Sequence, residues 1–318
     1  MKYIYIILSI FIIVSCDKAR FDTDYAPPIF PKEYKREITA LNRDLLLESF
    51  GGISFLCDSV FIIRANSTDN EHLFQALSIK DGHQITSFGN QGRANYELSD
   101  CRHAAYDNKA KHLYAMDMRL NMIDIDLGKA LSGDSRCVVG NHKLEGGWYA
   151  KYIHYLPNNR ILHVRSNPRL LVTDMTGKDT LAQYDNYHST IPEFDNDKRK
   201  RQLFFAHNTK SAIKPDGTKI LYYVSGKGCY TCDLNGKDVH YIALDCRAPQ
   251  WYNNHIIVGM HDEDNGKWMT ASAIVAYNMQ GDKQILVNKE NMAVYPYTAN
   301  GKIAFSTIYG EIYLMNVK

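Results

Sequence analysis

Two cysteines three positions apart have the spacing that most directly suggests chemistry. Cys229 and Cys232 form a Cys-x-x-Cys pair, as in thiol oxidoreductases. That chemistry needs the pair at a helix N-terminus, but here it lies between Gly228 and an Asn235-Gly236 turn, on a predicted strand. Residues three apart on a strand face opposite sides of a sheet, so the two thiols cannot bridge. We expect buried small residues at both positions rather than a redox centre.

Metal-binding patterns are present only in part. Residues 262–266 begin like a calcium loop, but the position that should carry the bidentate acid is Ala273, which excludes an EF-hand. We expect a solvated hairpin tip, with a weak propeller-type calcium site as the alternative. Residues 195–197 (Asp-Asn-Asp) are likewise interpreted as a solvated polar segment. The 12 histidines include no His-x-x-x-His pair and no zinc-like set with cysteine. We therefore predict no cofactor and no metal, while a metal bound by residues of several strands stays open.

Motifs for covalent catalysis and phosphate binding are missing from the sequence. There is no Gly-x-Ser-x-Gly elbow of a serine hydrolase and no glycine-rich loop with lysine. The only strong basic run is residues 198–201, and aromatic residues are not interleaved with it. The formal charge of +2 is spread over interspersed acids and bases. We therefore expect no nucleic-acid partner.

The first residues predict export and a lipid anchor. Lys2 precedes an apolar run over residues 3–14, and Ser15 and Cys16 form a small-residue cleavage site. The run is too short to span ~30 Å of hydrocarbon. Residues 13–16 (Ile-Val-Ser-Cys) resemble a bacterial lipobox, which makes Cys16 the expected site of lipid attachment. An ordinary secretory signal with an incidental cysteine is the alternative.

These features divide the chain into three parts. We expect a lipoprotein signal peptide over residues 1–15, a flexible tether over 16–35 and one folded domain over 36–318. The tether is polar and contains Pro27, Pro28 and Pro31, which suits a spacer between a membrane and a domain. Residues 17–20 lack an acidic run that would indicate surface export. We therefore expect an outer-membrane lipoprotein of the cell envelope, with the periplasmic face favoured over the cell surface.

A repeated turn-and-strand unit organises the folded domain. Six apolar strands each follow a tight turn, and a second series of turns lies further along the first five units. The first series is at residues 58–59, 108–109, 158–159, 216–217, 253–254 and 300–301, and the second is at 81–82, 127–128, 176–177, 235–236 and 280–281. The spacing of the first series is typical of propeller blades, and Asn-Gly and Asp-Gly turns join antiparallel strands.

The last repeat supplies only three of the four strands that each unit needs. Strands are expected at 293–298, 302–306 and 312–317, and the alternating segment 38–47 is otherwise unassigned. Pairing that segment with the last strand would close a ring, so that no apolar sheet face stays exposed to water. We therefore predict an all-β fold, a six-bladed β-propeller closed by an N-terminal strand that completes the last blade. A β-sandwich pair or an open solenoid is the alternative.

Residues 88–98 (Phe-Gly-Asn-Gln-Gly-Arg-Ala-Asn-Tyr-Glu-Leu) resemble the signature of TolB-like six-bladed β-propeller lipoproteins. Phe88, Gly89, Gly92 and Glu97 match in register, while residues 94–96 replace the family's Gly-Pro-Gly. Residues 301–306 and 312–316 also resemble the blade repeat of this family. The resemblance implies an exported, lipid-anchored propeller without an established enzymatic role, which binds a protein or a glycan.

Propellers bind ligands at the mouth of the central channel, where loops enter the innermost strands. In this sequence those loops contain aromatic and basic residues suited to a sugar, a peptide or an anionic group. The candidate binding residues are Arg102, His103, Trp148, Tyr149, His207, Asn208, Arg247, Trp251, Tyr295 and Tyr297. We expect a monomeric, non-catalytic binding or scaffolding module. The alternative is a channel-mouth hydrolase or lyase of the lactonase-like or polysaccharide-lyase-like propeller type, using His103, His207 and Asp245.

Overall fold

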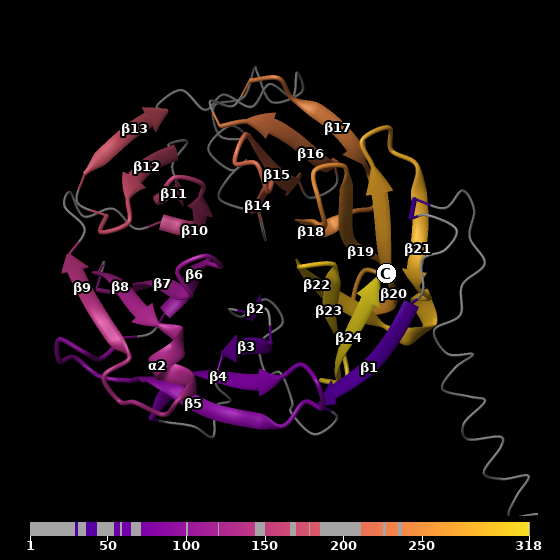
Figure 1. Cartoon of the computed structure of the whole chain (residues 1–318). Helices are drawn as coiled ribbons and strands as arrows, with labels where there is room; N and C mark the ends of the chain where they lie inside the picture. Colours follow the sequence, from indigo (N-terminus) through magenta and orange to yellow (C-terminus); the bar gives the residue numbers. More distant parts are fainter. Residues whose placement is uncertain are drawn as a thin grey trace, which may run out of the picture.

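The computed structural model describes residues 29–30, 36–42, 54–57, 59–64, 71–99, 101–119, 121–143, 150–165, 170–177, 179–184, 211–224, 227–234 and 237–317. Six four-stranded antiparallel sheets stand around a common centre as the blades of a β-propeller (Figure 1). The predicted fold class is therefore confirmed. In the first five blades the strands follow chain order from the centre to the rim.

The strands of these five blades have the following bounds. Blade 1 contains β2 (Ser54–Leu56), β3 (Val60–Arg64), β4 (His72–Ser78) and β5 (Gln84–Asn90). Blade 2 contains β6 (Cys101–Asp107), β7 (His112–Asp117), β8 (Asn121–Asp126) and β9 (Val138–Lys143). Blade 3 contains β10 (Ala150–Leu156), β11 (Arg160–Arg165), β12 (Leu170–Asp174) and β13 (Thr180–Tyr184). Blade 4 contains β14 (Ser211–Ile213), β15 (Lys219–Val224), β16 (Gly228–Asp233) and β17 (His240–Ala243). Blade 5 contains β18 (Arg247–Trp251), β19 (Ile256–Asp264), β20 (Met269–Asn278) and β21 (Lys283–Val287).

Blade 6 joins the two ends of the folded chain. Its strands β22 (Ala293–Ala299), β23 (Lys302–Thr307) and β24 (Ile312–Val317) come from the C-terminal end, and β1 (Arg36–Asn42) completes it. Strand β1 pairs antiparallel with β24, with Ile38 opposite Met315 and Thr39 opposite Leu314 (Figure 1). The predicted ring closure is confirmed, since the N-terminal strand shields the outer edge of β24.

The predicted turns that the structure describes join the first two strands of a blade or, further along, the last two. Residue 58 and the predicted turn at 235–236 lie outside the described residues. Several contain the positive φ angles that tight turns require, including 64° at Asn158, 48° at Asn300 and 74° at Gly217. The predicted turn at residues 127–128 is wrong, because the short helix α2 (Leu127–Leu131) begins there. The Asp126 carboxylate caps that helix by accepting the Lys129 N–H at 3.1 Å.

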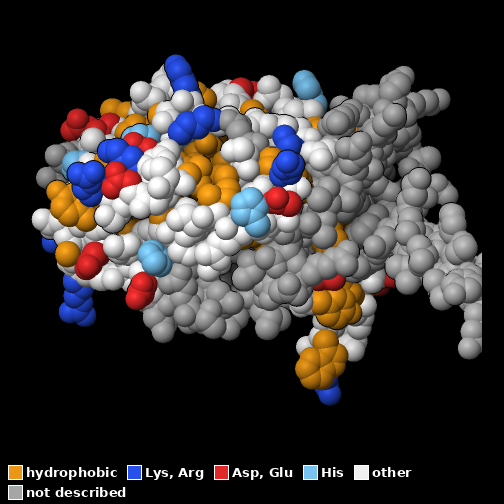
Figure 2. Space-filling model, turned by 60° about the horizontal axis from the view of Figure 1, so that its bottom comes forward, with side chains coloured by type: hydrophobic (Ala, Val, Ile, Leu, Met, Phe, Trp, Pro, Cys, Tyr) orange, Lys and Arg blue, Asp and Glu red, His pale blue; other side chains and the backbone are white. Residues whose placement is uncertain are grey.

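The blades pack face to face through buried side chains. Cys232 is buried with Leu156 and Leu162 of blade 3, while Cys229 is buried with Ile257 of blade 5. The two thiols therefore face opposite sides of blade 4, as predicted from their spacing. On the side of the molecule that Figure 2 shows, acidic and basic side chains are interspersed, with hydrophobic side chains visible between them.

The topology gives the ring two distinct faces. The upper face is defined here as the one on which innermost strands begin, so it carries the connections between blades and the hairpins between second and third strands. The lower face carries the turns between first and second strands and between third and fourth strands. The 3-10 helix η2 (Lys289–Asn291) lies in the connection from blade 5 to blade 6, and thus on the upper face.

Candidate functional site at the upper face

The candidate residues fall into three groups in the structure. Arg102 and His103 are on β6, Arg247 is the first residue of β18, and Tyr295 is near the start of β22, so all four lie at the upper ends of innermost strands. Trp251 and Tyr297 lie further along β18 and β22. The remaining four, Trp148, Tyr149, His207 and Asn208, lie outside the described residues.

A bulge marks the upper end of four innermost strands. The pairing register shifts between Cys101 and His103 on β6, between Ala150 and Tyr152 on β10, and in the same region of β18 and β22. A bulge turns side chains away from the regular alternation of the sheet, and bulges are frequent beside active sites. The regular strand pairing is therefore interrupted at the upper ends of these four strands.

In blades 5 and 6 the bulge also contains a left-handed residue. Ala248 has φ 46° and precedes Pro249, and Tyr295 has φ 51° and precedes Pro296. A non-glycine residue in this conformation costs of order 1–3 kcal/mol, and such strain tends to gather at functional sites. The same strained motif thus occurs twice, beside two of the residues that the sequence singled out.

An ion pair lies at the first of these bulges. The Arg247 guanidinium donates through Nη1 to the carboxylate of Asp262 on β19. The Asp262 side chain is only 5% exposed, whereas that of Arg247 is 37% exposed. The buried carboxylate therefore holds a guanidinium that still has N–H groups for an anionic or polar ligand.

Tyr295 belongs to the same cluster. Burial raises the pKa of its phenol, while the nearby charge of Arg247 acts in the opposite direction. The hydroxyl consequently stays protonated at neutral pH. Arg247 and Tyr295 are thus near enough to interact electrostatically at the junction of blades 5 and 6.

A second polar group in blade 5 is centred on His261. Its Nδ1 lies 2.8 Å from Lys283 Nζ, and its Nε2 lies 3.7 Å from the Asp245 carboxylate. Because an ammonium can only donate, Nδ1 is the acceptor and Nε2 carries the proton, directed toward Asp245. Asp245, which the sequence offered as part of an alternative active site, thus has His261 as its titratable neighbour.

Trp251 and Tyr297 point into blade interfaces. Trp251 is 5% exposed and packs in the core between blades 4 and 5, with Lys214 Nζ 6.0 Å from the ring centroid. Tyr297 packs against Phe61 of blade 1, with ring centroids 6.0 Å apart. Both residues follow the bulge of their strand, so their side chains have returned to the regular alternation and face a neighbouring blade.

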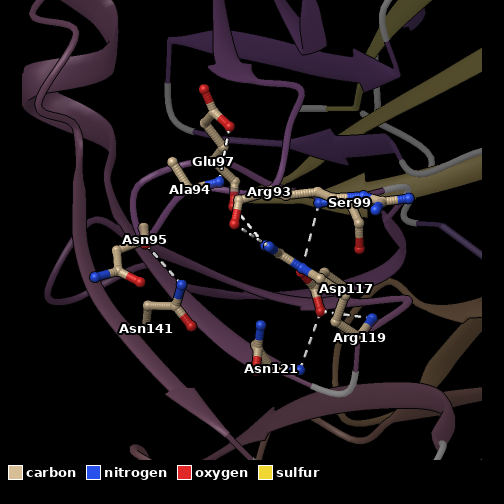
Figure 3. A network of polar contacts seen from close by, with 9 residues as sticks. All are labelled: Arg93, Ala94, Asn95, Glu97, Ser99, Asp117, Arg119, Asn121 and Asn141. Carbon is tan, nitrogen blue, oxygen red and sulfur yellow. Dashed lines mark hydrogen bonds and ion pairs between the residues drawn. The ribbon is translucent and has the colours of Figure 1, made fainter.

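The segment that resembles the TolB-like signature forms a clamp between blades 1 and 2 (Figure 3). The Glu97 carboxylate accepts the Ala94 N–H at 2.8 Å, and a Cβ at Gly92 would lie 1.9 Å from a Glu97 oxygen. Arg119 donates to the backbone carbonyls of Arg93 and Glu97, both at 2.8 Å. The matched glycine and glutamate therefore shape the connection that leads into β6.

Asp117, the last residue of β7, holds this connection in place. Its carboxylate, which is fully buried, accepts a hydrogen bond from Arg119 Nε at 2.8 Å. It also accepts backbone N–H groups of Arg119 at 2.9 Å and Asn121 at 3.0 Å (Figure 3). The network holds the connection that leads into β6, the strand on which Arg102 and His103 lie.

Large hydrophobic side chains are exposed on the upper face and at the rim. Five lie in blade connections or hairpins of the upper face, namely Tyr96, Met118, Leu244, Trp268 and Tyr309, with Trp268 70% and Tyr309 64% exposed. Four others lie on the outermost strands of blades 1 to 4, namely Ile85, Val139, Leu181 and Tyr241. Within the described part of the chain, no turn of the lower face exposes a large hydrophobic side chain.

The described residues contain no group of three or more His, Cys, Asp or Glu side chains placed to hold a metal ion. They also contain no helix with the length and hydrophobicity needed to cross a membrane. Of the acidic segment 262–266, residues 262–264 end β19 and residues 265–266 enter the hairpin turn, where the Asp264 and Asn265 side chains accept backbone N–H groups. The expected solvated tip is wrong for Asp262, which is buried against Arg247.

Comparison with known proteins does not identify a family for this chain. No protein-family model matches the sequence, and no curated protein is similar to it at a significant level. Among solved structures, the chain is similar to one described as hydrazine synthase from Kuenenia stuttgartiensis. The two share 10% identity over 83% of this chain and 75% of the other, with a TM-score of 0.47. At that level of likeness we draw no argument about function from it.

Proposed function

We propose that this protein is a non-catalytic binding or scaffolding module that uses the upper face of its propeller to bind a protein or glycan. The observation that carries the proposal is the set of five large hydrophobic side chains exposed in the connections and hairpins of the upper face, whereas the described turns of the lower face expose none and the other four lie at the rim, on outermost strands. Exposed tryptophan and tyrosine supply contact area and hydrogen bonding to proteins and sugars. Arg247 and Tyr295 add a polar centre to this surface.

We further propose that the protein is an outer-membrane lipoprotein of the TolB-like type, attached through Cys16, monomeric and facing the periplasm. The N-terminal pattern of residues 1–16 supports the anchor, and residues 88–98 support the family. Changing Cys16→Ser and fractionating the cells tests the anchor. We expect the wild-type protein in the membrane fraction and the variant in the soluble fraction, and equal partitioning of the two would contradict the proposal.

Ligand binding is tested on glycan and peptide arrays with the purified protein. For ligands that bind, we expect the double variant Trp268→Ser, Tyr309→Ser to raise Kd by about tenfold or more, as for aromatic hot spots. The matched control is Val139→Ser, Leu181→Ser, which removes exposed hydrophobic side chains from the rim and should leave Kd unchanged. Equal losses in both variants would contradict binding through the upper face.

A hydrolase or lyase is the second candidate, and the pair of Asp245 and His261 is the observation that favours it. Acid–base catalysis needs titratable groups near one another, and these two lie 3.7 Å apart. Array ligands should be incubated with the protein and analysed for cleavage by mass spectrometry. Turnover that is lost in His261→Ala but kept in His255→Ala, a histidine of a lower turn, would establish the enzyme in place of the binding module.

A further inference from the structure

Two residues from the N-terminal segment are attached to the lower side of blade 5. The backbone N–H groups of Ile29 and Phe30 both donate to the side-chain oxygen of Gln284, at 2.6 and 3.1 Å. A carbonyl oxygen has two lone pairs, so two consecutive N–H groups satisfy it fully. In Figure 1 this short segment lies beside β21 of blade 5, although β1, which follows it closely in the sequence, belongs to blade 6.

Hydrophobic packing strengthens the attachment. Phe30 is 4% exposed and meets Tyr252 edge to face, with ring centroids 5.1 Å apart and an angle of 82°. It also belongs to the hydrophobic cluster that joins blades 5 and 6, with Val258 and Phe305 among its members. Burial of a phenylalanine side chain and an aromatic edge contact are both stabilising.

Gln284 differs from its counterparts in the other blades. It is the second residue of the outermost strand β21 and is buried beneath Ile29 and Phe30. In blades 1 to 4 the second residue of the outermost strand is a large exposed hydrophobic residue: Ile85, Val139, Leu181 or Tyr241. Among these five second residues, Gln284 is the buried one and the one that accepts hydrogen bonds from a backbone segment.

The contact of Ile29 and Phe30 with blade 5 lies on the lower face of the ring. Tyr252 lies in the turn between β18 and β19, and Gln284 follows the turn between β20 and β21, so both mark the lower face. Residue 29 lies 29 − 16 = 13 positions after Cys16. A chain of that length reaches at most about 45 Å when fully extended.

We infer that the docking of Ile29 and Phe30 on blade 5 orients the propeller, so that its lower face is turned to the membrane and its upper face is presented away from it. This rests on the proposed lipid anchor at Cys16 and on the proposed binding role of the upper face. A segment of the chain itself is the ligand of the Gln284 and Tyr252 surface. Without it, the tether would be free to present either face to a partner.

Energy transfer on acylated full-length protein in vesicles tests this orientation. A donor dye is placed either on the upper face, through Lys267→Cys, or on the lower face, through Asn254→Cys, and acceptor dyes are carried by lipids. The six described native cysteines are all buried and should not label in the folded protein. We expect clearly stronger transfer from position 254 than from position 267.

The double change Phe30→Ala, Gln284→Ala should then reduce the difference between the two dye positions by at least half. The control Ile85→Ala, at the second residue of the outermost strand of blade 1, should preserve it. Equal transfer from both positions in the wild-type background, or an unaltered difference in the double variant, would overturn the inference.

A separate measurement keeps the docking testable if the lipid anchor fails. In Cys16→Ser protein, trypsin cleavage after Lys32 should be about tenfold faster in the Phe30→Ala, Gln284→Ala variant than in Ile85→Ala. An unchanged rate of cleavage would show that Ile29 and Phe30 are not held on blade 5. Thermal unfolding of each variant verifies that the blades remain folded. If the wild-type protein does not bind vesicles at all, the anchor proposal falls and the orientation falls with it.

Discussion

Arg119 and Asp117 form a salt bridge in which the carboxylate is fully buried and the two side-chain atoms Nε and Oδ2 are 2.8 Å apart. The same guanidinium binds two backbone carbonyls of the connection between blades 1 and 2. Removing the cation leaves a buried charge without its partner. We predict that Arg119→Ala lowers the free energy of unfolding by about 3 kcal/mol in denaturant titrations.

Arg136→Ala is the matched control, because Asp134 and Arg136 have the same two-residue spacing but lie at the surface. Exposed ion pairs of this kind contribute little to stability. We expect the control to unfold at the wild-type denaturant concentration. Equal destabilisation of the two variants would contradict a stabilising role of Arg119 in the connection between blades 1 and 2.

Ring closure predicts a strong effect of deleting β1. Without residues 36–42, β24 loses its antiparallel partner and presents an unpaired edge. We expect this deletion to leave no soluble monomer in size-exclusion chromatography. Deleting residues 17–28 instead, which keeps both β1 and Phe30, should give a soluble monomer. A soluble, monomeric product of the first deletion would contradict the closure.

Gly259 is required by close packing beneath the candidate site. A Cβ at this position would lie 2.5 Å from Cys246 Sγ and 3.0 Å from the Arg247 carbonyl oxygen. We predict that Gly259→Ala destabilises the protein by about 1–3 kcal/mol, as overpacking does, and weakens ligand binding by displacing Arg247. Gly128→Ala in the exposed first turn of α2, where the nearest side-chain atom is at 3.3 Å, should be close to neutral in the same unfolding assay.

Buried tyrosines predict loss of stability at alkaline pH. Burial raises the pKa of the Tyr114, Tyr222 and Tyr277 phenols above the ordinary value of about 10. The unfolded chain therefore releases these protons first, so the free energy of unfolding falls as the pH rises above about 10. Each such phenol contributes a slope of about 1.4 kcal/mol per pH unit. Urea titrations from pH 8 to 12 measure this slope. An unfolding free energy that does not change with pH, together with phenolate absorbance that rises near pH 10, would contradict the burial of these phenols.

The sequence predicts local features of this fold better than contacts between strands. Turns such as Asn300-Gly301 are recognisable because few residue types accept positive φ, and counting the strands of the last unit identified the need for β1. The pair of Arg247 and Asp262 was missed, because it depends on β19 continuing past Met260, which lies opposite Arg247, the first residue of β18. A strand bulge has no fixed sequence signal, so the directions of Trp251 and Tyr297 were equally inaccessible.

Hydrogen exchange measured with and without a ligand identified on the arrays tests most directly whether the upper face binds that ligand. We predict slower exchange at the upper face, in residues 244–247, 261–268 and 293–295. Residues 252–255 and 279–282 of the lower turns should exchange at the same rate in both samples. Protection confined to those lower turns would contradict the account.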